Sequence, residues 1–531
     1  MADQGQLALL RQGREEWNQW RYDQPQVLDL TSAGLSHICL SGANLSGANL
    51  RGADLSHARL SKADLSGVDL QGAELYKTDL REASLNSALL NGAKLNRARL
   101  IAADLRGADL REIRLSEAWL NYADLSEADL RDANLSEADL SHTKLYKADL
   151  RGANLSYANL SGADLRGANL NAACLQGADL SGANLSGANF SGANLRCSIL
   201  SYANARRADL SGARLSEASL CAVDLRGASL LDADLRWSNL SGTKLSYAQL
   251  GGANLVGVNL SYADLSQTEL RKNVDLRSAI LRGVNLKRSD LSQIDLSEVD
   301  LSGARLEEAD LSEARLNSAD LRGANLHSAV LRRAQLPRAH LDEANLNEAI
   351  LSEANLSDAS LSAANLSGTD LSGTNLSGAN LSGVRLNSGK LSAASLGKTN
   401  LGSANLSNAN LSHAQLHLSN LSKADLSGAN LSGADLSHTD LSYADLSGTD
   451  LHATILSEAN LEHTNLSRAQ LIETNLQRAQ LEKATLKGAH FERADLRGIP
   501  WLFIMELTLQ QGVTWKDLRF DRVMDESDAK N

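Results

Sequence analysis

The chain has 531 residues, with 52 Lys and Arg against 64 Asp and Glu, which gives a net charge of -12. It is 43% apolar but only 4% aromatic and holds three prolines, which excludes an ordinary multidomain enzyme with aromatic cores and proline-rich linkers. Apolar runs stay well below the roughly 18 residues of a membrane span, the start of the chain does not resemble a secretory signal, and the four cysteines lack metal-ligand spacing. We therefore expect a cytoplasmic protein with no cofactor, no metal and no membrane partner.

Residues 1–25 are the first predicted element, an N-terminal helical cap. Residues 6–21 place Leu10, Gly13, Trp17 and Trp20 at helical spacing, and Pro25 ends the segment. A stack of repeats exposes its apolar core and its unpaired strand edges at both ends. We therefore expect this helical segment to cover the start of the repeats that follow.

Residues 26–500 form one long repeat with a period of five. Leucine recurs at every fifth position from Leu30 to Leu270 and, after one extra residue, from Leu276 to Leu496. The exceptions are Phe190, Ala205 and Phe491. A small residue stands two positions before each leucine, so both point to the same side of a short strand, and the Asn or Asp between them points away. Ser-Gly after the leucine supplies a turn. The pattern predicts a coil of parallel strands wound around its own leucines.

The unit Ala43-Asn44-Leu45-Ser46-Gly47 and its copies resemble the A(D/N)LXX signature of the pentapeptide repeat family. The resemblance implies an all-β fold, a right-handed quadrilateral parallel β-helix with one pentapeptide per side and therefore four pentapeptides per coil. Ser36-His37 and Ser56-His57 recur at that spacing. The N-terminal segment also resembles the helical leaders of cyanobacterial members of the family.

Outward charges are expected to stack in columns if each coil takes four pentapeptides. Arg59, Asp79 and Arg99 alternate in sign along one column, which favours a structural role for the charges. Asp109, Asp129 and Asp149 would lie directly above one another. We expect their mutual repulsion to raise the pKa of at least one carboxyl in that column.

Two features near the extra residue are candidate partner-binding surfaces. The coil from 271 to 290 has a net charge opposite to that of the chain, and it is either a tolerated insertion with solvated charges or a docking collar for an acidic partner. Its basic residues are Arg271, Lys272, Arg277, Arg282, Lys287 and Arg288. Exposed aromatic residues precede it at Tyr202, Trp237, Tyr247 and Tyr262, and such residues anchor interfaces or simply lie scattered on a surface.

Residues 501–531 are the last predicted element, a C-terminal cap and tail. Trp501 follows Leu496 by five positions, and an apolar run that includes Phe503 comes next. The segment is predicted to be a lid over the last coil. A homodimer contact through Trp501 and Phe503 is the alternative, which the resemblance to gyrase-protecting members of the family implies.

The sequence contains no arrangement of residues typical of a catalytic site, so we expect a non-catalytic scaffold, a rigid rod-shaped solenoid that binds an unidentified protein. The alternative implied by the resemblance is a DNA mimic that binds a topoisomerase such as gyrase. At about 4.8 Å per coil the rod would measure roughly 110 Å, and duplex DNA of that length carries roughly 65 negative charges. The net charge of -12 is far smaller, and it also disfavours direct binding of nucleic acid.

Overall fold

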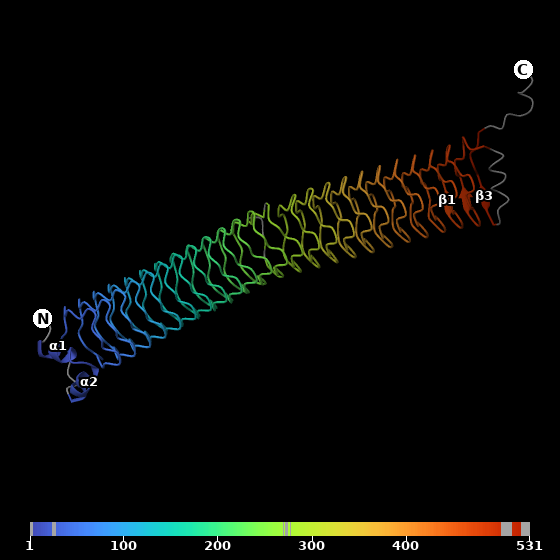
Figure 1. The fold of residues 1–531 in the computed structure, drawn as a ribbon. Helices are drawn as coiled ribbons and strands as arrows, with labels where there is room; N and C mark the ends of the chain where they lie inside the picture. Colours follow the sequence, from blue (N-terminus) through green and yellow to red (C-terminus); the bar gives the residue numbers. More distant parts are fainter. Residues whose placement is uncertain are drawn as a thin grey trace, which may run out of the picture. The chain divides into compact units, whose positions relative to one another are not determined.

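The computed structural model describes residues 4–23, 28–268, 270, 274–276, 278–500 and 512–521. It divides the chain into two compact units. The first comprises residues 1–269 with 273–279, and the second comprises residues 270–272 with 280–531. The predicted repeat region, 26–500, is shared between the two units, and the division falls at the extra residue that interrupts the period of five. Each unit is a stack of similar coils (Figure 1).

Two short helices begin the first unit. α1 spans Gln4–Leu10 and α2 spans Arg14–Asp23, so the single helical segment expected over residues 6–21 is in fact broken. The break lies at Gly13, whose φ of 129° is incompatible with a continuous right-handed helix. Trp17 on α2 is fully buried. Pro25, expected to end this segment, lies outside the described residues.

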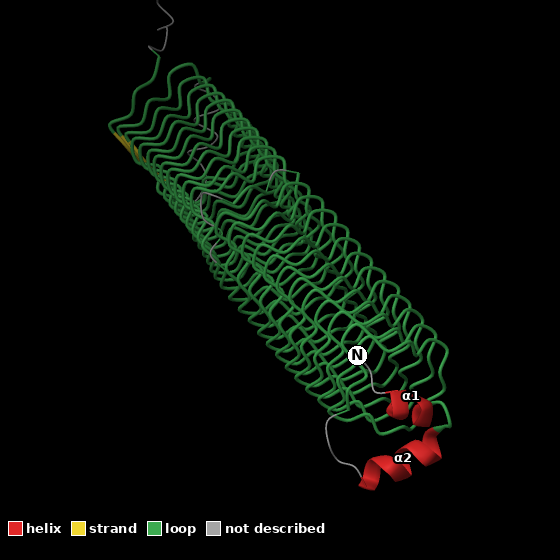
Figure 2. Cartoon of the chain, turned by 90° about the vertical axis from the view of Figure 1, so that its left-hand side faces the viewer, coloured by secondary structure: helices red, strands yellow, loops and turns green. Residues whose placement is uncertain are grey.

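Helix α2 lies beside the first coil (Figure 2), and its side chains bond to several backbone groups of that coil. In later coils, the backbone N–H at the position equivalent to Asn44 donates to a carbonyl of the preceding coil. Asp64 N–H, for example, donates to Ala43 O at 2.9 Å. At the first coil the Asn18 side chain takes over, since its Oδ1 accepts from Asn44 N–H at 2.8 Å. Trp17 Nε1 donates to Asn44 O at 2.8 Å, and Arg21 donates to Ser46 O at 2.7 Å. The predicted cap therefore satisfies a strand edge with side chains.

Parallel bridges join residues 20 apart, and each coil makes four of them. One coil is represented by Asn44↔Asp64, Asn49↔Asp69, Asp54↔Glu74 and Arg59↔Asp79. This register confirms a quadrilateral β-helix with one pentapeptide per side. Most strands are a single bridged residue. Longer strands form near the end of the second unit, where β1 (Gln470–Ile472), β2 (His490–Glu492) and β3 (Thr514–Lys516) pair in parallel in that order.

The leucines and the small residues fill the inside of the coils, as the period predicts. Leu45 and Ala43 are almost completely buried. Phe190, Ala205 and Phe491, which stand where the repeat has leucine, are buried as well. Burial of a leucine contributes about 1.5 to 3 kcal/mol relative to leaving it exposed. Because the same contribution recurs at nearly every fifth position, the core supplies a continuous apolar column within each unit.

Each corner is a tight turn whose geometry explains the Asn or Asp before the leucine. In one example Ala48 N–H donates to Leu45 O at 3.1 Å, and Gly47 between them has a φ of 65°, as in a type II turn. The Asn44 side chain also takes part, since its Oδ1 accepts from Ser46 N–H at 3.1 Å. A short carboxylate or amide two positions before a backbone N–H is needed for this contact.

The stacked aspartates do not behave as expected. The bridges Asp109↔Asp129 and Asp129↔Asp149 confirm the column, yet hydrogen bonds from Arg111 and Arg131 hold the pKa of Asp109 and Asp129 below the usual range. Arg111 Nη2 lies 2.6 Å from Asp109 Oδ2, and Arg111 Nε lies 3.8 Å from Asp129 Oδ2. Arg131 makes the same two contacts, at the same distances, with Asp129 and Asp149. The prediction of a raised pKa is wrong for these two groups because it considered the column and omitted the arginines beside it.

The extra residue is accommodated at the end of the first unit. There Asn254 pairs with Asp275, a step of 21, and Leu255 N–H donates to Asp275 O at 3.1 Å. In the second unit the regular step between coils is present from Ile280↔Asp300 onward. Residues 271–273 and 277 lie outside the described residues.

Near the C-terminus, Trp515 on β3 stacks on Phe491 of β2, with ring centroids 4.3 Å apart. Leu471 on β1 pairs with Phe491 on β2, a step of 20 residues, whereas Phe491 pairs with Trp515 on β3, a step of 24. An aromatic ring thus covers the preceding aromatic core residue. Trp501 and Phe503, expected to form the lid or a dimer contact, lie outside the described residues, and that expectation stays a prediction.

Candidate functional site

Side chains that could meet a partner stand on the corners of the coils. The second residue after each leucine takes a left-handed backbone conformation, with φ near 60° at Tyr202, Trp237, Tyr247 and Tyr262. These four aromatic side chains are exposed. Because the bridges join positions 20 apart, positions that differ by a multiple of 20 share a corner. Any surface must therefore be assembled from columns and not from neighbours in the sequence.

The predicted aromatic residues do not form one patch. Tyr202 and Tyr262 share one corner at a separation of three coils, as the steps of the bridges require. Trp237 and Tyr247 belong to two other corners of the four. The structure therefore distributes these aromatic side chains over three corners, and Tyr247 lies with three arginines around one depression.

Where the structure describes the predicted basic coil, one carboxylate of the next coil faces two of its basic residues. Lys287 and Arg288 flank one corner, and both face Glu308 in the next coil, at 3.8 Å and 2.8 Å. The hydrogen bond from Arg288 lowers the pKa of Glu308. Arg282 is exposed on the preceding corner. Arg271, Lys272 and Arg277 lie outside the described residues, so a collar of six basic residues stays a prediction.

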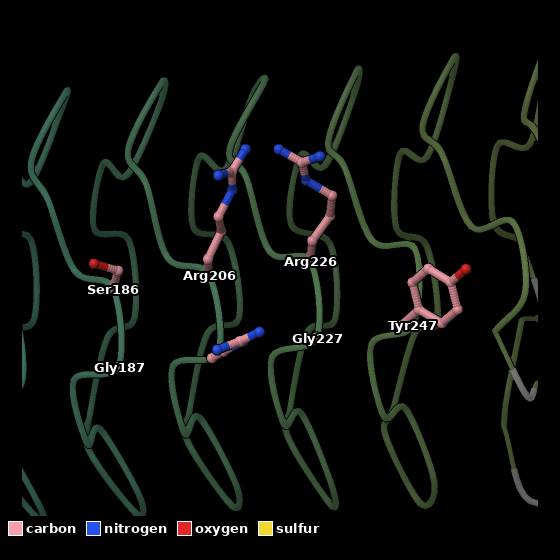
Figure 3. A pocket seen from close by; sticks show the side chains of 7 residues that line it. Ser186, Gly187, Arg206, Arg226, Gly227 and Tyr247 are labelled. Atoms are coloured by element: carbon pink, nitrogen blue, oxygen red, sulfur yellow. The ribbon is translucent and has the colours of Figure 1, made fainter.

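A different basic surface lies on the corner that carries Tyr247. An open depression of about 790 Å³ occupies four successive coils of the first unit. In Figure 3, Arg206 and Arg226 stand side by side on adjacent coils, and Tyr247 follows on the next. We call this depression the corner pocket; its lining residues are Ser186, Gly187, Arg206, Arg207, Arg226, Gly227 and Tyr247.

One carboxylate holds two of the arginines of the corner pocket. Asp224 accepts from Arg226 Nε and Nη2 at 2.9 Å and 2.7 Å, and from Arg206 Nε at 2.8 Å. The Asp224 side chain is only 16% exposed, whereas those of Arg206 and Arg226 are 51% and 40% exposed. The partly buried carboxylate therefore fixes two guanidinium groups that remain open to solvent.

Arg207 differs from the other two arginines. In the part of the chain that the structure describes, its side chain has no ion pair or hydrogen bond. Its Cγ lies 3.7 Å from the position that a Cβ on Gly227 would take, so its aliphatic part lies against the next coil. Three guanidinium groups thus line the corner pocket, and the single carboxylate of Asp224 pairs with two of them, which leaves a local charge of opposite sign to that of the chain.

The arginines of the corner pocket were absent from the sequence-based prediction, although a signal for them exists. Arg226 stands four pentapeptides after Arg206, and Asp224 precedes Arg226 by two positions. These spacings become meaningful once the coil length is known. The prediction selected the basic residues that were adjacent in the sequence, around 271–290, and overlooked those that the register places one above another.

Among the residues that the structure describes, no cluster of three His, Cys, Asp or Glu side chains could hold a metal ion. Within the described ranges, no helix is long and apolar enough to cross a membrane. Cys39, Cys174, Cys197 and Cys221 are free thiols.

Comparison with known proteins identifies the repeats. The family model described as pentapeptide repeats matches overlapping segments that together span residues 29–171 and 173–499. A comparison with curated proteins finds no match.

Several solved structures are similar to this chain. HetL, described as a pentapeptide repeat protein involved in heterocyst differentiation regulation from the cyanobacterium Nostoc sp. strain PCC 7120, is 33% identical; the match covers 50% of this chain and 94% of HetL, with a TM-score of 0.23. Rfr23, a pentapeptide repeat protein from the cyanobacterium Cyanothece 51142, is 38% identical over 18% of this chain and 62% of its own, with a TM-score of 0.14. QnrB1, described as a plasmid-mediated fluoroquinolone resistance protein, is 22% identical; the match covers 36% of this chain and 88% of QnrB1, with a TM-score of 0.24.

Proposed function

Because this chain belongs to the pentapeptide repeat family, we propose that it is a non-catalytic scaffold that binds a partner protein through side chains on the corners of its coils, in the cytoplasm. The observation that carries the proposal is the corner pocket, where three arginines and a tyrosine from successive coils gather on an otherwise acidic chain.

The fold separates the residues that maintain the structure from those that could bind. Leucines and small residues point inward and are buried, whereas the corner residues point outward and vary freely in size and charge. A surface of this kind can change its partner without changing its core. This separation suits a scaffold better than an enzyme, since catalysis requires convergent groups in an enclosed cavity.

The composition of the corner pocket favours an acidic protein as the partner. Arginine and tyrosine are the residue types, with tryptophan, that contribute most to binding at protein interfaces. The depression is open, so it suits side chains that project from another surface. Its excess of positive charge attracts carboxylates or other anions. The DNA-mimicking alternative has less support, because a DNA mimic would present negative charge at such a surface.

The proposal is tested by affinity capture from an extract of the cells that produce the protein. The wild type is compared with a variant in which Arg206, Arg207 and Arg226 are all replaced by Gln. The matched control replaces Arg106, Arg166 and Arg236 by Gln; these arginines pair with Asp104, Asp164 and Asp234 elsewhere on the coils.

We expect the wild type and the control variant to retain the same partner and the pocket variant to lose it. Equal retention by the pocket variant would show that binding does not use the corner pocket. Retention of no specific protein by the wild type would contradict the scaffold function itself.

A further inference from the structure

We propose that the corner pocket binds a phosphate monoester carried by a serine or threonine side chain of the partner. This inference rests on the proposed function, because it names the chemical group that the partner presents. It concerns the same three arginines, Arg206, Arg207 and Arg226, and adds a requirement that an acidic partner in general would not meet.

The first argument is charge. Three guanidinium groups and the single carboxylate of Asp224 leave an excess of two positive charges at the pocket. A phosphate monoester carries about -1.5 to -2 at neutral pH, whereas a carboxylate carries only a single negative charge. The dianion therefore balances the site, and one aspartate or glutamate side chain of a partner does not.

The second argument is the supply of hydrogen-bond donors. Asp224 engages Nε and Nη2 of Arg226 but only Nε of Arg206. The terminal nitrogens of Arg206 therefore remain available, and so does the whole guanidinium of Arg207. Guanidinium groups bind phosphate through two parallel N–H bonds, and a phosphate offers three oxygens to receive them. Arg206 and Arg207 are consecutive residues in the lining of the pocket, and both have donors that are not engaged.

The third argument is preorganisation. Arg206 and Arg226 are held against Asp224, and the backbone bridge Asn204↔Asp224 fixes their two coils. Arg207 follows Arg206 on the same coil, with its aliphatic part against Gly227. An anion that enters the pocket thus meets two guanidinium groups, those of Arg206 and Arg226, whose freedom is already reduced, which lowers the entropic cost of binding. Tyr247 lies on the neighbouring coil (Figure 3), where its exposed ring can contact the peptide that carries the phosphate.

The test uses the full chain and three degenerate peptide libraries that differ only in their central residue, which is phosphoserine, serine or glutamate. Each library is passed over immobilised wild-type protein, the Arg207→Gln variant and the Arg166→Gln variant. Arg166 serves as the control because it lies on the same corner as Arg206, two coils before it, and pairs with Asp164 at 2.6 Å. A thermal unfolding curve for each variant checks that the fold is retained.

We expect the wild type to retain the phosphoserine library at least about tenfold more than the serine or glutamate libraries, since a phosphate brings more charge and more acceptor oxygens than either side chain. Arg207→Gln should remove most of that preference, Arg166→Gln should leave it unchanged, and millimolar inorganic phosphate should compete. Equal retention of the glutamate and phosphoserine libraries, or an equal loss in both variants, would overturn the phosphate assignment. Because the capture experiment above requires no phosphate, it can succeed while this one fails.

Discussion

Two stretches of the chain have the same core but very different surfaces. Residues 79–166 in the first unit carry aspartates and arginines two positions apart, such as Asp104 with Arg106 and Asp164 with Arg166, each pair at 2.6 Å. Residues 361–450 in the second unit carry amide ladders instead, as where Asn420 Nδ2 donates to Asn400 Oδ1 at 3.1 Å. None of the four Lys and Arg between 361 and 450 pairs with an acidic residue that the structure describes.

Both stretches nevertheless have the same coil length and bury their leucines equally. The coil is therefore specified by the inward residues and the turns, and the outward residues can be ionic or neutral without altering it. Surfaces such as the corner pocket can thus differ along the chain at little cost to stability.

The largest expected effect concerns the shared core. Leu130→Ala in the first stretch and Leu401→Ala in the second both remove a fully buried side chain. We expect each to cost about 2 to 5 kcal/mol, with similar values in the two stretches because the core is the same. Hydrogen exchange followed by mass spectrometry measures the local loss, since a repeat protein opens in segments. A negligible cost at either position would contradict the equivalence of the two cores.

A smaller effect is expected at corner glycines. An added Cβ at Gly162 would lie 2.6 Å from His142 Nδ1, whereas Gly182 on the same corner has open space, and both have φ near 65°. The His142 ring also stacks on Tyr122, with centroids 5.2 Å apart. We expect Gly162→Ala to cost about 1 kcal/mol more than Gly182→Ala, because the ring must leave its rotamer and its stacking partner.

The second unit offers the matching test at corners. Gly433 lies against His413, at 2.5 Å from the added Cβ to Nδ1, and Gly448 has open space. Gly433→Ala should therefore cost more than Gly448→Ala when the free energies of local opening are compared. Equal costs within both pairs would show that the contact between a corner ring and the next coil does not limit which residue the corner accepts.

The smallest expected effect is a difference in acid stability. Hydrogen bonds from arginine hold the pKa of Asp104, Asp109, Asp129 and Asp164 below the unfolded value. A lowered folded pKa contributes stability above the unfolded pKa of about 3.9, and this stability is lost as the pH falls through the folded pKa. Exchange protection, corrected for intrinsic rates, should therefore fall more in residues 79–166 than in 361–450 below about pH 4. The contribution of ion pairs at a surface is modest, so the difference should be small. An equal decline of exchange protection in the two stretches would contradict any contribution from these Asp–Arg pairs.

The sequence predicted the core well because inward positions obey one simple rule. The leucine period and the recurrence of Ser36-His37 at Ser56-His57 pointed to the observed coil, and the rings of His37 and His57 stack at 4.8 Å. The helix break at Gly13 escaped prediction because a single glycine is compatible with helical spacing until the packing of the cap is known. The role of Asn44 in its turn also required the backbone geometry of the corner.

Surface properties were harder to predict because they depend on residues one coil away or two positions along. Arg288 seemed unopposed until Glu308 was placed beside it. Tyr202 and Trp237 seemed close in the sequence but occupy different corners. Within the candidate site, Tyr247 was predicted, whereas Arg206 and Arg226 become neighbours only when the register is known.

The regular pairing between coils depends on residues 20 apart lying on adjacent coils. The most direct test introduces cysteines at Ser372 and Ser392, whose hydroxyl oxygens lie 3.4 Å apart, in a background where the four native cysteines are replaced by serine. Strands about 4.8 Å apart place the two Cα atoms within disulfide range. We predict that Ser372→Cys with Ser392→Cys forms a disulfide on mild oxidation and that Ser372→Cys with Asn387→Cys does not. Failure of the first pair, or equal reaction of the second, would contradict a coil of four pentapeptides.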